Sequence, residues 1–83
     1  NYSIEFLNSA AKEFRKLSIE IQRSMIYPID ALSNNPYPHK TKKLRNTDLY
    51  RIRVGDYRII YQVDNEGKSV LITKIGHRRE VYK

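Results

Sequence analysis

Three arginines lie within eight residues of one another in the second half of the chain, on either side of the pair Gly55-Asp56. Arg51 and Arg53 precede this pair, and Arg58 follows it. If Gly55-Asp56 forms a two-residue hairpin loop, counting outward from the loop places Arg53 directly opposite Arg58. Guanidinium groups donate paired hydrogen bonds to phosphate oxygens. The spacing therefore predicts a phosphate-binding clamp.

The same register separates the apolar side chains of the hairpin from its arginines. One face carries the cross-strand pairs Val54/Tyr57, Ile52/Ile59 and Tyr50/Tyr61, and the other face carries the arginines. Like charges directly opposite each other cost up to about 1 kcal/mol, so stability alone would not favour Arg53 facing Arg58. Two interpretations stay open. The two guanidinium groups point into water or are bridged by Asp48 or Asp56, or they bind phosphate together with Arg51.

A second group of candidate residues lies near the end of the chain, in the run Gly76-His77-Arg78-Arg79-Glu80-Val81-Tyr82. Histidine is the side chain that ordinarily exchanges a proton near neutral pH, which makes His77, beside the arginines, a candidate for proton transfer. Arg78 adds a further cation, and Tyr82 either packs against the fold or stacks on a nucleic-acid base. Four more candidates for binding RNA or phosphate lie upstream of the hairpin: Lys40, Lys42, Lys43 and Arg45.

The excess positive charge lies in the second half of the chain. Sixteen Lys and Arg residues against nine Asp and Glu give a formal net charge of +7, of which residues 1–38 contribute 0, residues 39–61 contribute +5 and residues 62–83 contribute +2. A neutral half followed by a basic half predicts a surface that faces a polyanion. A solvated basic surface without a partner is the alternative.

Several classes of chemistry are excluded by what the sequence lacks. The chain has no Cys, which excludes disulfides, thiolate zinc sites and cysteine nucleophiles. It also lacks paired carboxylates, metal-ligand clusters, a glycine-rich phosphate loop and a nucleophile elbow. We therefore expect no metal and no cofactor, and a chemistry that depends on Arg, Lys, His and Tyr. No apolar stretch approaches the roughly 18 residues of a membrane span, so we expect a cytoplasmic protein without a membrane partner.

The hydrophobic pattern predicts a single α+β domain over residues 1–83 that begins with a strand and two helices. Residues 2–7 alternate and predict the strand, after which Asn8 or Ser9 is expected to cap the first helix and Ser18 the second. The apolar faces of the two helices are Ala10, Phe14 and Leu17, and Ile21, Met25, Ile29 and Leu32.

The rest of the chain predicts a loop and a three-stranded meander. A polar, basic loop over residues 36–46 leads to strands over residues 49–54, 57–63 and 69–75. The order β-α-α-β-β-β predicts two N-terminal helices packed on one side of a small antiparallel sheet.

Three stretches in combination resemble the RelE/ParE superfamily of toxins from bacterial and archaeal toxin–antitoxin pairs, and its RelE branch more than its ParE branch. They are Lys43-Leu44-Arg45, the hairpin over residues 49–61, and the run over residues 76–82. The resemblance covers essentially the whole chain and implies the RelE-like, microbial-ribonuclease-like fold. It also implies an activity: a RelE-branch toxin enters the ribosomal A site and cuts messenger RNA there without a metal, as the 2′-hydroxyl attacks the adjacent phosphate.

The resemblance assigns roles by motif position. Arg51 and Arg53 stand where the family has basic residues on the second strand, and Arg58 stands at its phosphate-stabilising arginine. Arg78 matches the arginine after the last strand, and Tyr82 matches the C-terminal tyrosine that stacks on a base.

The proton-transfer residue stays open. Some relatives have a lysine that is proposed as the general base, but the matching Arg53 cannot readily accept a proton. Other relatives use a carboxylate upstream of the second strand, and the stretch Thr41-Lys42-Lys43 offers none. This leaves His77 as the candidate, or catalysis by positioning and charge stabilisation alone.

The resemblance also implies partners: a cognate acidic antitoxin, the ribosome and messenger RNA, with operator DNA bound by the toxin–antitoxin complex through the antitoxin. Two other functions stay open. A ParE-like topoisomerase inhibitor without nuclease activity would share the fold and would not need the three hairpin arginines to face one way. A non-catalytic RNA-binding module could also use the basic loop and the tyrosines.

Overall fold

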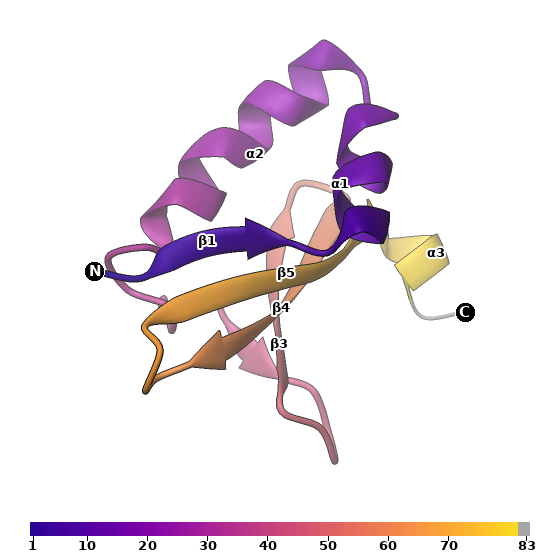
Figure 1. The fold of residues 1–83 in the computed structure, drawn as a ribbon. Helices are drawn as coiled ribbons and strands as arrows, with labels where there is room; N and C mark the ends of the chain where they lie inside the picture. The colour runs from indigo at the N-terminus through magenta and orange to yellow at the C-terminus, as the bar shows by residue number, and fades with distance from the viewer. Residues whose placement is uncertain (82–83) are drawn as a thin grey trace.

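Two helices cover one face of a five-stranded sheet in the computed structural model, which describes residues 1–81 (Figure 1). In chain order the elements are β1 (Ser3–Phe6), α1 (Asn8–Arg15), α2 (Ile19–Ala31), β2 (Lys42–Lys43), β3 (Leu49–Val54), β4 (Tyr57–Asp64), β5 (Ser69–His77) and α3 (Arg78–Val81). The strands are ordered β1-β5-β4-β3-β2 across the sheet. This architecture confirms the predicted α+β class. Within residues 1–81, no helix is long and apolar enough to cross a membrane.

The sheet is mixed, whereas the sequence predicted an antiparallel one. β1 pairs with β5 in parallel, from Ser3 opposite Ser69 to Phe6 opposite Ile72, and the other neighbouring strands are antiparallel. Tight turns join β3 to β4 and β4 to β5, and a tight turn makes its two strands antiparallel. β1 and β5 are instead separated by most of the chain, so their direction is not set by a turn.

The first helix begins without the side-chain cap that the sequence predicted at Asn8 or Ser9. Leu7 occupies the cap position of α1 and makes no side-chain hydrogen bond. Its N–H still donates to the Ile72 carbonyl of β5, while its own carbonyl already accepts from the Ala11 N–H, both at 2.9 Å. The chain therefore passes from strand to helix within this one residue. Ser18 does cap α2, as predicted, because its Oγ accepts from the Ile21 N–H at 3.3 Å.

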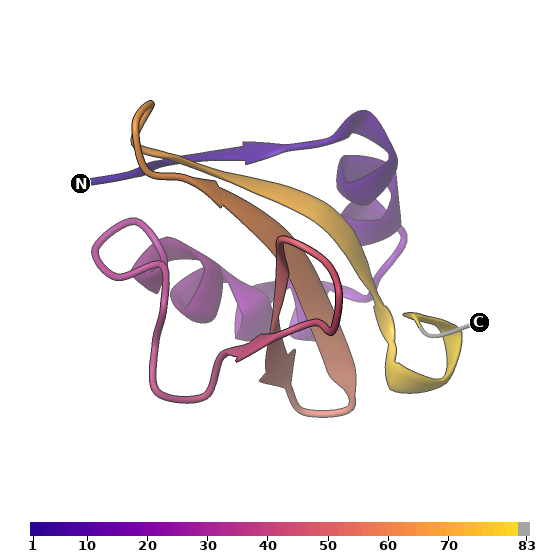
Figure 2. The same ribbon diagram turned by 90° about the horizontal axis from the view of Figure 1, so that it is seen from below.

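The predicted apolar faces of the helices meet the sheet and form the core. Ala10, Met25 and Leu32 are fully buried, and they pack with Ile59 and Tyr61 from the hairpin face that the register assigned to the core. Fully burying a large apolar side chain stabilises a fold by about 1.5–3 kcal/mol. This core holds the hairpin from one side only. Figure 2 views the sheet from the opposite side, where α1 and α2 leave it uncovered.

The basic stretch before the hairpin is tied to the sheet by a buried tyrosine. The Tyr61 hydroxyl donates to the Pro36 carbonyl at 2.7 Å and shares a hydrogen bond with Thr41 Oγ1 at 2.5 Å. Directly after Thr41, the two residues of β2 pair with β3, so the predicted loop over residues 36–46 contains a short strand. The sheet therefore fixes the path of the basic stretch at both of these points.

Candidate functional site

The hairpin of β3 and β4 has the register that its sequence predicts. The cross-strand pairs are Val54/Tyr57, Arg53/Arg58, Ile52/Ile59, Arg51/Ile60, Tyr50/Tyr61 and Leu49/Gln62. Gly55 has a φ of +60° at the first loop position, where a type II′ turn requires glycine. A Cβ at Gly55 would meet no atom within 4 Å, so backbone conformation and not space selects glycine there. The turn therefore makes Arg53 and Arg58 direct neighbours.

Four cationic side chains project from the face of the sheet that points away from α1 and α2, and we call them the basic face: Lys42, Arg51, Arg53 and Arg58. Lys42 lies opposite Arg51, and Arg53 lies opposite Arg58. Residues opposite each other, or two apart along one strand, share a face, which places all four together. Each like-charged pair costs up to about 1 kcal/mol. An anion bound between the pairs would offset that repulsion.

The two arginines of the hairpin pair differ in burial. Arg53 is exposed, because β2 pairs with Tyr50 and Arg51 and does not reach as far as Arg53. Arg58 lies on the central strand β4 opposite Gly76, and only 7% of its surface is exposed. The interpretation in which both guanidinium groups point into water is therefore wrong.

The structure does not bring the His77 side chain to the basic face. His77 lies opposite Tyr57 on the helix-facing side of the sheet, with the two ring centroids 5.5 Å apart. Its neighbours there include Glu13 and Lys16, around a cavity of about 340 Å³. Sequence reasoning placed His77 beside the arginines, but adjacent residues of a strand point to opposite faces. Gly76, and not the His77 side chain, is therefore next to Arg58.

Arg78 begins α3 where β5 meets the hairpin loop. Its N–H donates to the Asp56 carbonyl at 2.9 Å, which ties the start of α3 to the turn between β3 and β4. Its side chain is exposed, at the same end of the sheet as Arg53 and Arg58. Tyr82, the candidate for base stacking, lies outside the described residues.

The remaining candidates divide between the two ends of β3. Lys40 lies with His39 and Arg53 around an open depression of about 570 Å³, so it adjoins the basic face. The sequence did not single out His39, because this residue does not lie beside the arginines along the chain. Lys43 and Arg45 line a separate open depression of about 640 Å³ at the start of β3. The structure therefore brings Lys40 to the arginines and leaves Arg45 at the far end of the strand.

The chemistry available on the basic face is that of cations and hydrogen-bond donors. Exposed Arg53 presents a planar guanidinium, which can donate two parallel hydrogen bonds to one phosphate. Lys40, beside Arg53, and Lys42, opposite Arg51, extend the positive surface along β3, as binding to a chain of phosphates requires. Within residues 1–81, no three His, Asp or Glu side chains gather into a group that could hold a metal ion. The arrangement can stabilise negative charge that develops on a bound phosphate.

Comparisons with known proteins identify the family of the chain. The family model described as ParE toxin of type II toxin-antitoxin system, parDE, matches residues 4–82. The chain is 31% identical to the toxin RelE of Mycobacterium tuberculosis, over 99% of this chain and 87% of the relative. It is 29% identical to the mRNA interferase toxin RelE of Escherichia coli K12, over 98% of this chain and 90% of that relative.

The fold gives the same result as the sequence. The structure superimposes on a chain of the intact E. coli RelBE toxin–antitoxin complex with a TM-score of 0.83 and 29% identity, over 93% of this chain and 96% of that chain. Both relatives by sequence are RelE proteins, which confirms the resemblance to the RelE branch, although the family model carries the ParE name. The chain therefore belongs to the RelE/ParE superfamily of toxins of type II toxin–antitoxin systems.

Proposed function

We propose that this toxin is a ribosome-dependent endonuclease that cleaves messenger RNA in the A site. The observation that carries the proposal is the basic face, in which exposed Arg53 stands directly opposite buried Arg58. Such a pair opposes stability and leaves one guanidinium accessible, as a phosphate-binding clamp requires. The E. coli relative is named an mRNA interferase, which supports messenger RNA as the substrate.

The proposed reaction uses no metal and no cofactor. The 2′-hydroxyl oxygen of one nucleotide attacks the adjacent phosphorus, and the bond from that phosphorus to the 5′ oxygen of the next nucleotide breaks. The attacking hydroxyl loses its proton and the departing 5′ oxygen gains one, so the products carry a 2′,3′-cyclic phosphate and a 5′-hydroxyl. Negative charge builds up on the non-bridging phosphate oxygens in the transition state. Arg53 would donate hydrogen bonds to these oxygens, and Arg58, directly opposite it, would add its positive charge.

The other candidates would hold the RNA around the reacting phosphate. Arg51, Lys42 and Lys40 would bind neighbouring phosphates along the face, and Arg78 would bind from the start of α3. Lys43 and Arg45 would bind RNA phosphates farther away, at the other end of β3. Tyr82 would stack on a base.

The placement of His77 bears on the proton transfer. Its side chain lies on the helix-facing side of the sheet, which supports catalysis by positioning and charge stabilisation alone. Direct proton transfer by His77 is the alternative.

A translation reaction tests the proposed function. Purified protein is added to ribosomes on a defined message, and the cleaved ends are mapped on ribosome-bound and on free RNA. We expect cuts in the A-site codon of the bound message only. Arg53→Ala should lower the cleavage rate by about 10²-fold or more, the effect of removing one donor to the transition-state charge. Arg23→Ala, a change at an exposed arginine of α2, serves as the matched control. Uncut message with the parent protein would contradict the proposal.

A second function is favoured by the family model, which is that of ParE toxins. A ParE-like protein would inhibit a topoisomerase and leave RNA intact. The protein is therefore also added to a plasmid supercoiling assay with a bacterial topoisomerase. Inhibition there, together with uncut message, would assign the chain to this function. RNA binding without cleavage or inhibition would instead identify a non-catalytic RNA-binding module.

We further propose that a small acidic antitoxin covers the basic face and that the complex binds operator DNA through the antitoxin. The net charge of +7 on the toxin and the similarity to a chain of the RelBE toxin–antitoxin complex support this partner. Opposite charges speed association and make it sensitive to salt. Expressing the chain alone should arrest growth, and expressing the adjacent gene with it should restore growth. A folded chain that leaves growth unchanged would contradict the toxin assignment in that host.

A further inference from the structure

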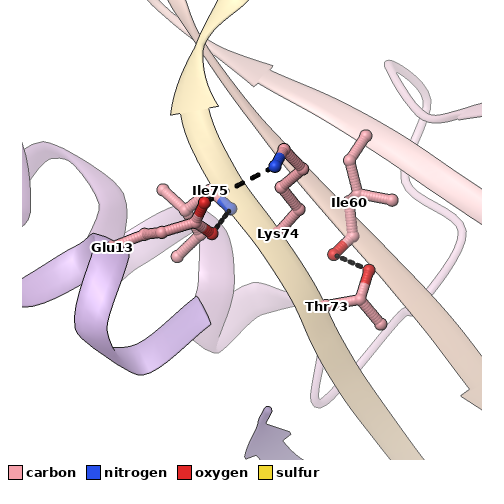
Figure 3. Close-up of polar contacts among 5 residues, drawn as sticks. All are labelled: Glu13, Ile60, Thr73, Lys74 and Ile75. Atoms are coloured by element: carbon pink, nitrogen blue, oxygen red, sulfur yellow. Dashed lines mark hydrogen bonds and ion pairs between the residues drawn. The ribbon is translucent and has the colours of Figure 1, made fainter. Parts of the chain in front are cut away.

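Where β1 ends, a side chain of α1 replaces it as the hydrogen-bond partner of β5. The pairing of β1 with β5 stops at Phe6 and Ile72, and the chain then turns into α1. Beyond that point Glu13 of α1 reaches β5, and its Oε1 accepts a hydrogen bond from the Ile75 N–H at 3.0 Å (Figure 3). A charged acceptor makes this a stronger bond than one between neutral groups. The Glu13 carboxylate thus stands in for a backbone carbonyl at this edge of the sheet.

The opposite edge of β5 is irregular at the same level. Ile60 pairs with Lys74, but Tyr61 pairs with Ile72, so Thr73 is an extra residue that forms a β-bulge. The Thr73 hydroxyl donates to the Ile60 carbonyl at 3.2 Å (Figure 3). A bulge bends its strand and changes the direction of the residues that follow. Two side chains, one on each edge, therefore hold β5 at its bend.

The segment after the bend contacts the proposed catalytic hairpin. Gly76 lies opposite Arg58, and the Arg78 N–H donates to the Asp56 carbonyl in the hairpin loop. The Ile75 N–H that Glu13 holds belongs to the residue directly before Gly76. A shift of β5 at this point would move the strand beside which Arg58 is buried.

We propose that Glu13 is a positioning residue for RNA cleavage: through the Ile75 N–H it holds the end of β5 against the hairpin and so keeps Arg58 in place. This inference rests on the proposed function for its effect on cleavage. Nothing in the sequence pattern points to it, because a glutamate within a surface helix normally faces solvent.

The backbone contact, and not the ion pair of Glu13, is the part of the interaction that matters. Glu13 Oε2 lies 3.6 Å from Lys74 Nζ, but the two side chains are 34% and 45% exposed. Exposed pairs of this kind contribute little. Glu13→Gln keeps an amide oxygen that can accept from the Ile75 N–H, whereas Glu13→Ala removes the acceptor. The two variants therefore separate the backbone contact from the charge.

The first measurement does not depend on activity. Glu13→Ala should speed hydrogen exchange of the Ile75 amide by about tenfold or more, as a local hydrogen bond is lost. It should also shift the Nε–Hε resonance of Arg58 in the NMR spectrum. Glu13→Gln should keep the exchange rate of the Ile75 amide and the Arg58 resonance close to their values in the parent. Lys12→Ala, at an exposed position of the same helix, is the matched control. Unchanged Ile75 exchange and Arg58 resonance in Glu13→Ala would overturn the inference.

The second measurement is cleavage of ribosome-bound message under single-turnover conditions. Glu13→Ala should lower the saturating rate by about 10- to 100-fold, as expected when a catalytic group is slightly misplaced. The toxin concentration for half-maximal rate should change by less than about threefold, and Glu13→Gln should restore the rate, since positioning and not binding is affected. A variant that loses thermal stability but keeps the rate would show a merely structural role and overturn the inference.

Two controls keep the outcomes distinct. If Glu13→Ala does not fold, Thr73→Val removes the other contact at the bend, and it should shift the Arg58 resonance and lower the saturating rate in the same direction. If Thr73→Val changed neither the Arg58 resonance nor the saturating rate, the inference would be overturned. If the parent protein cuts no message, the proposed function fails, and the Ile75 exchange and Arg58 resonance still decide whether Glu13 positions Arg58.

Discussion

Arg53 and Arg58 are direct cross-strand partners, but Arg53 is exposed whereas only 7% of the surface of Arg58 is exposed. The difference arises from their neighbours, because Arg53 lies beyond the reach of β2 while Arg58 lies between β3 and β5 on the central strand. In the proposed anion site, exposed Arg53 would be the accessible half and buried Arg58 the fixed half. Each half can be tested by its own substitution.

The two arginines should have opposite effects on stability. Arg53→Ala removes a repulsion and should leave the free energy of unfolding unchanged or raise it by up to about 1 kcal/mol. Arg58→Ala should lower it by about 1–3 kcal/mol, because the packing of a buried stem is lost. Urea unfolding of the two variants and the parent measures both effects. Equal losses in the two variants would show that they share one structural role.

Inorganic phosphate should stabilise the folded protein through the basic face. At equal ionic strength, sodium phosphate should raise Tm above its value in sodium chloride. A stabilisation of about 1 kcal/mol corresponds to about 4–8 °C for a domain of this size. Arg53→Ala should abolish the difference between the two salts, and Arg23→Ala on α2 should keep it. A full response in Arg53→Ala would place the anion somewhere else.

The buried hydroxyl of Tyr61 should make stability depend on alkaline pH. Burial, the largest cause, raises the pKa of Tyr61 above its ordinary value of 10.0. The unfolded chain therefore loses this proton at a lower pH than the folded chain. The contribution to stability is complete below pH 10.0 and is lost as the pH rises toward the raised value.

Tyr61→Phe isolates this effect, because phenylalanine cannot ionise. At about pH 8 the variant should be about 1–2 kcal/mol less stable than the parent, since the Pro36 carbonyl and the Thr41 hydroxyl lose their partner. This difference in the free energy of unfolding should narrow above about pH 10, where only the parent loses stability through ionisation of this hydroxyl. Urea unfolding at several alkaline pH values measures the difference. A constant difference would mean that the two states ionise Tyr61 at the same pH.

Local pattern was enough to predict the hairpin and the helix faces. The register on either side of Gly55-Asp56 follows from the alternation of apolar and polar residues and from the two-residue loop. The structure has this register along β3 and β4. Met25 and Leu32 follow helical periodicity and are buried as predicted. These features depend on residues close together in the chain, so the sequence displays them directly.

Features that join distant segments were not predictable from pattern. The position of Arg58 opposite Gly76 depends on how β5 pairs with β4, and the parallel pairing of β1 depends on β5 as well. The contact between Glu13 and Ile75 joins the first helix to the last strand. The side of the sheet that His77 faces depends on its register with Tyr57, which the hairpin alone does not set.

The placement of His77 leads to a prediction about proton transfer. Its Nδ1 accepts a hydrogen bond from the Arg79 N–H at 3.3 Å, as a capping residue does at the start of a helix. Asparagine can supply an acceptor at the same place without a titratable ring, so His77→Asn should keep the start of α3 intact. We expect its cleavage rate on ribosome-bound message to stay within about threefold of the parent, because in the proposed mechanism the arginines act without a general base from the helix-facing side of the sheet.

His77→Ala provides the matched control, because it removes the acceptor as well as the ring. A slower rate in His77→Ala with a near-normal rate in His77→Asn would assign His77 to holding α3 in place. A loss of about 10²–10⁴-fold in His77→Asn, with ribosome binding retained, is the effect expected of a general acid or base. That result would require the imidazole to reach the basic face on the ribosome, and it would replace catalysis by the arginines alone with proton transfer by His77.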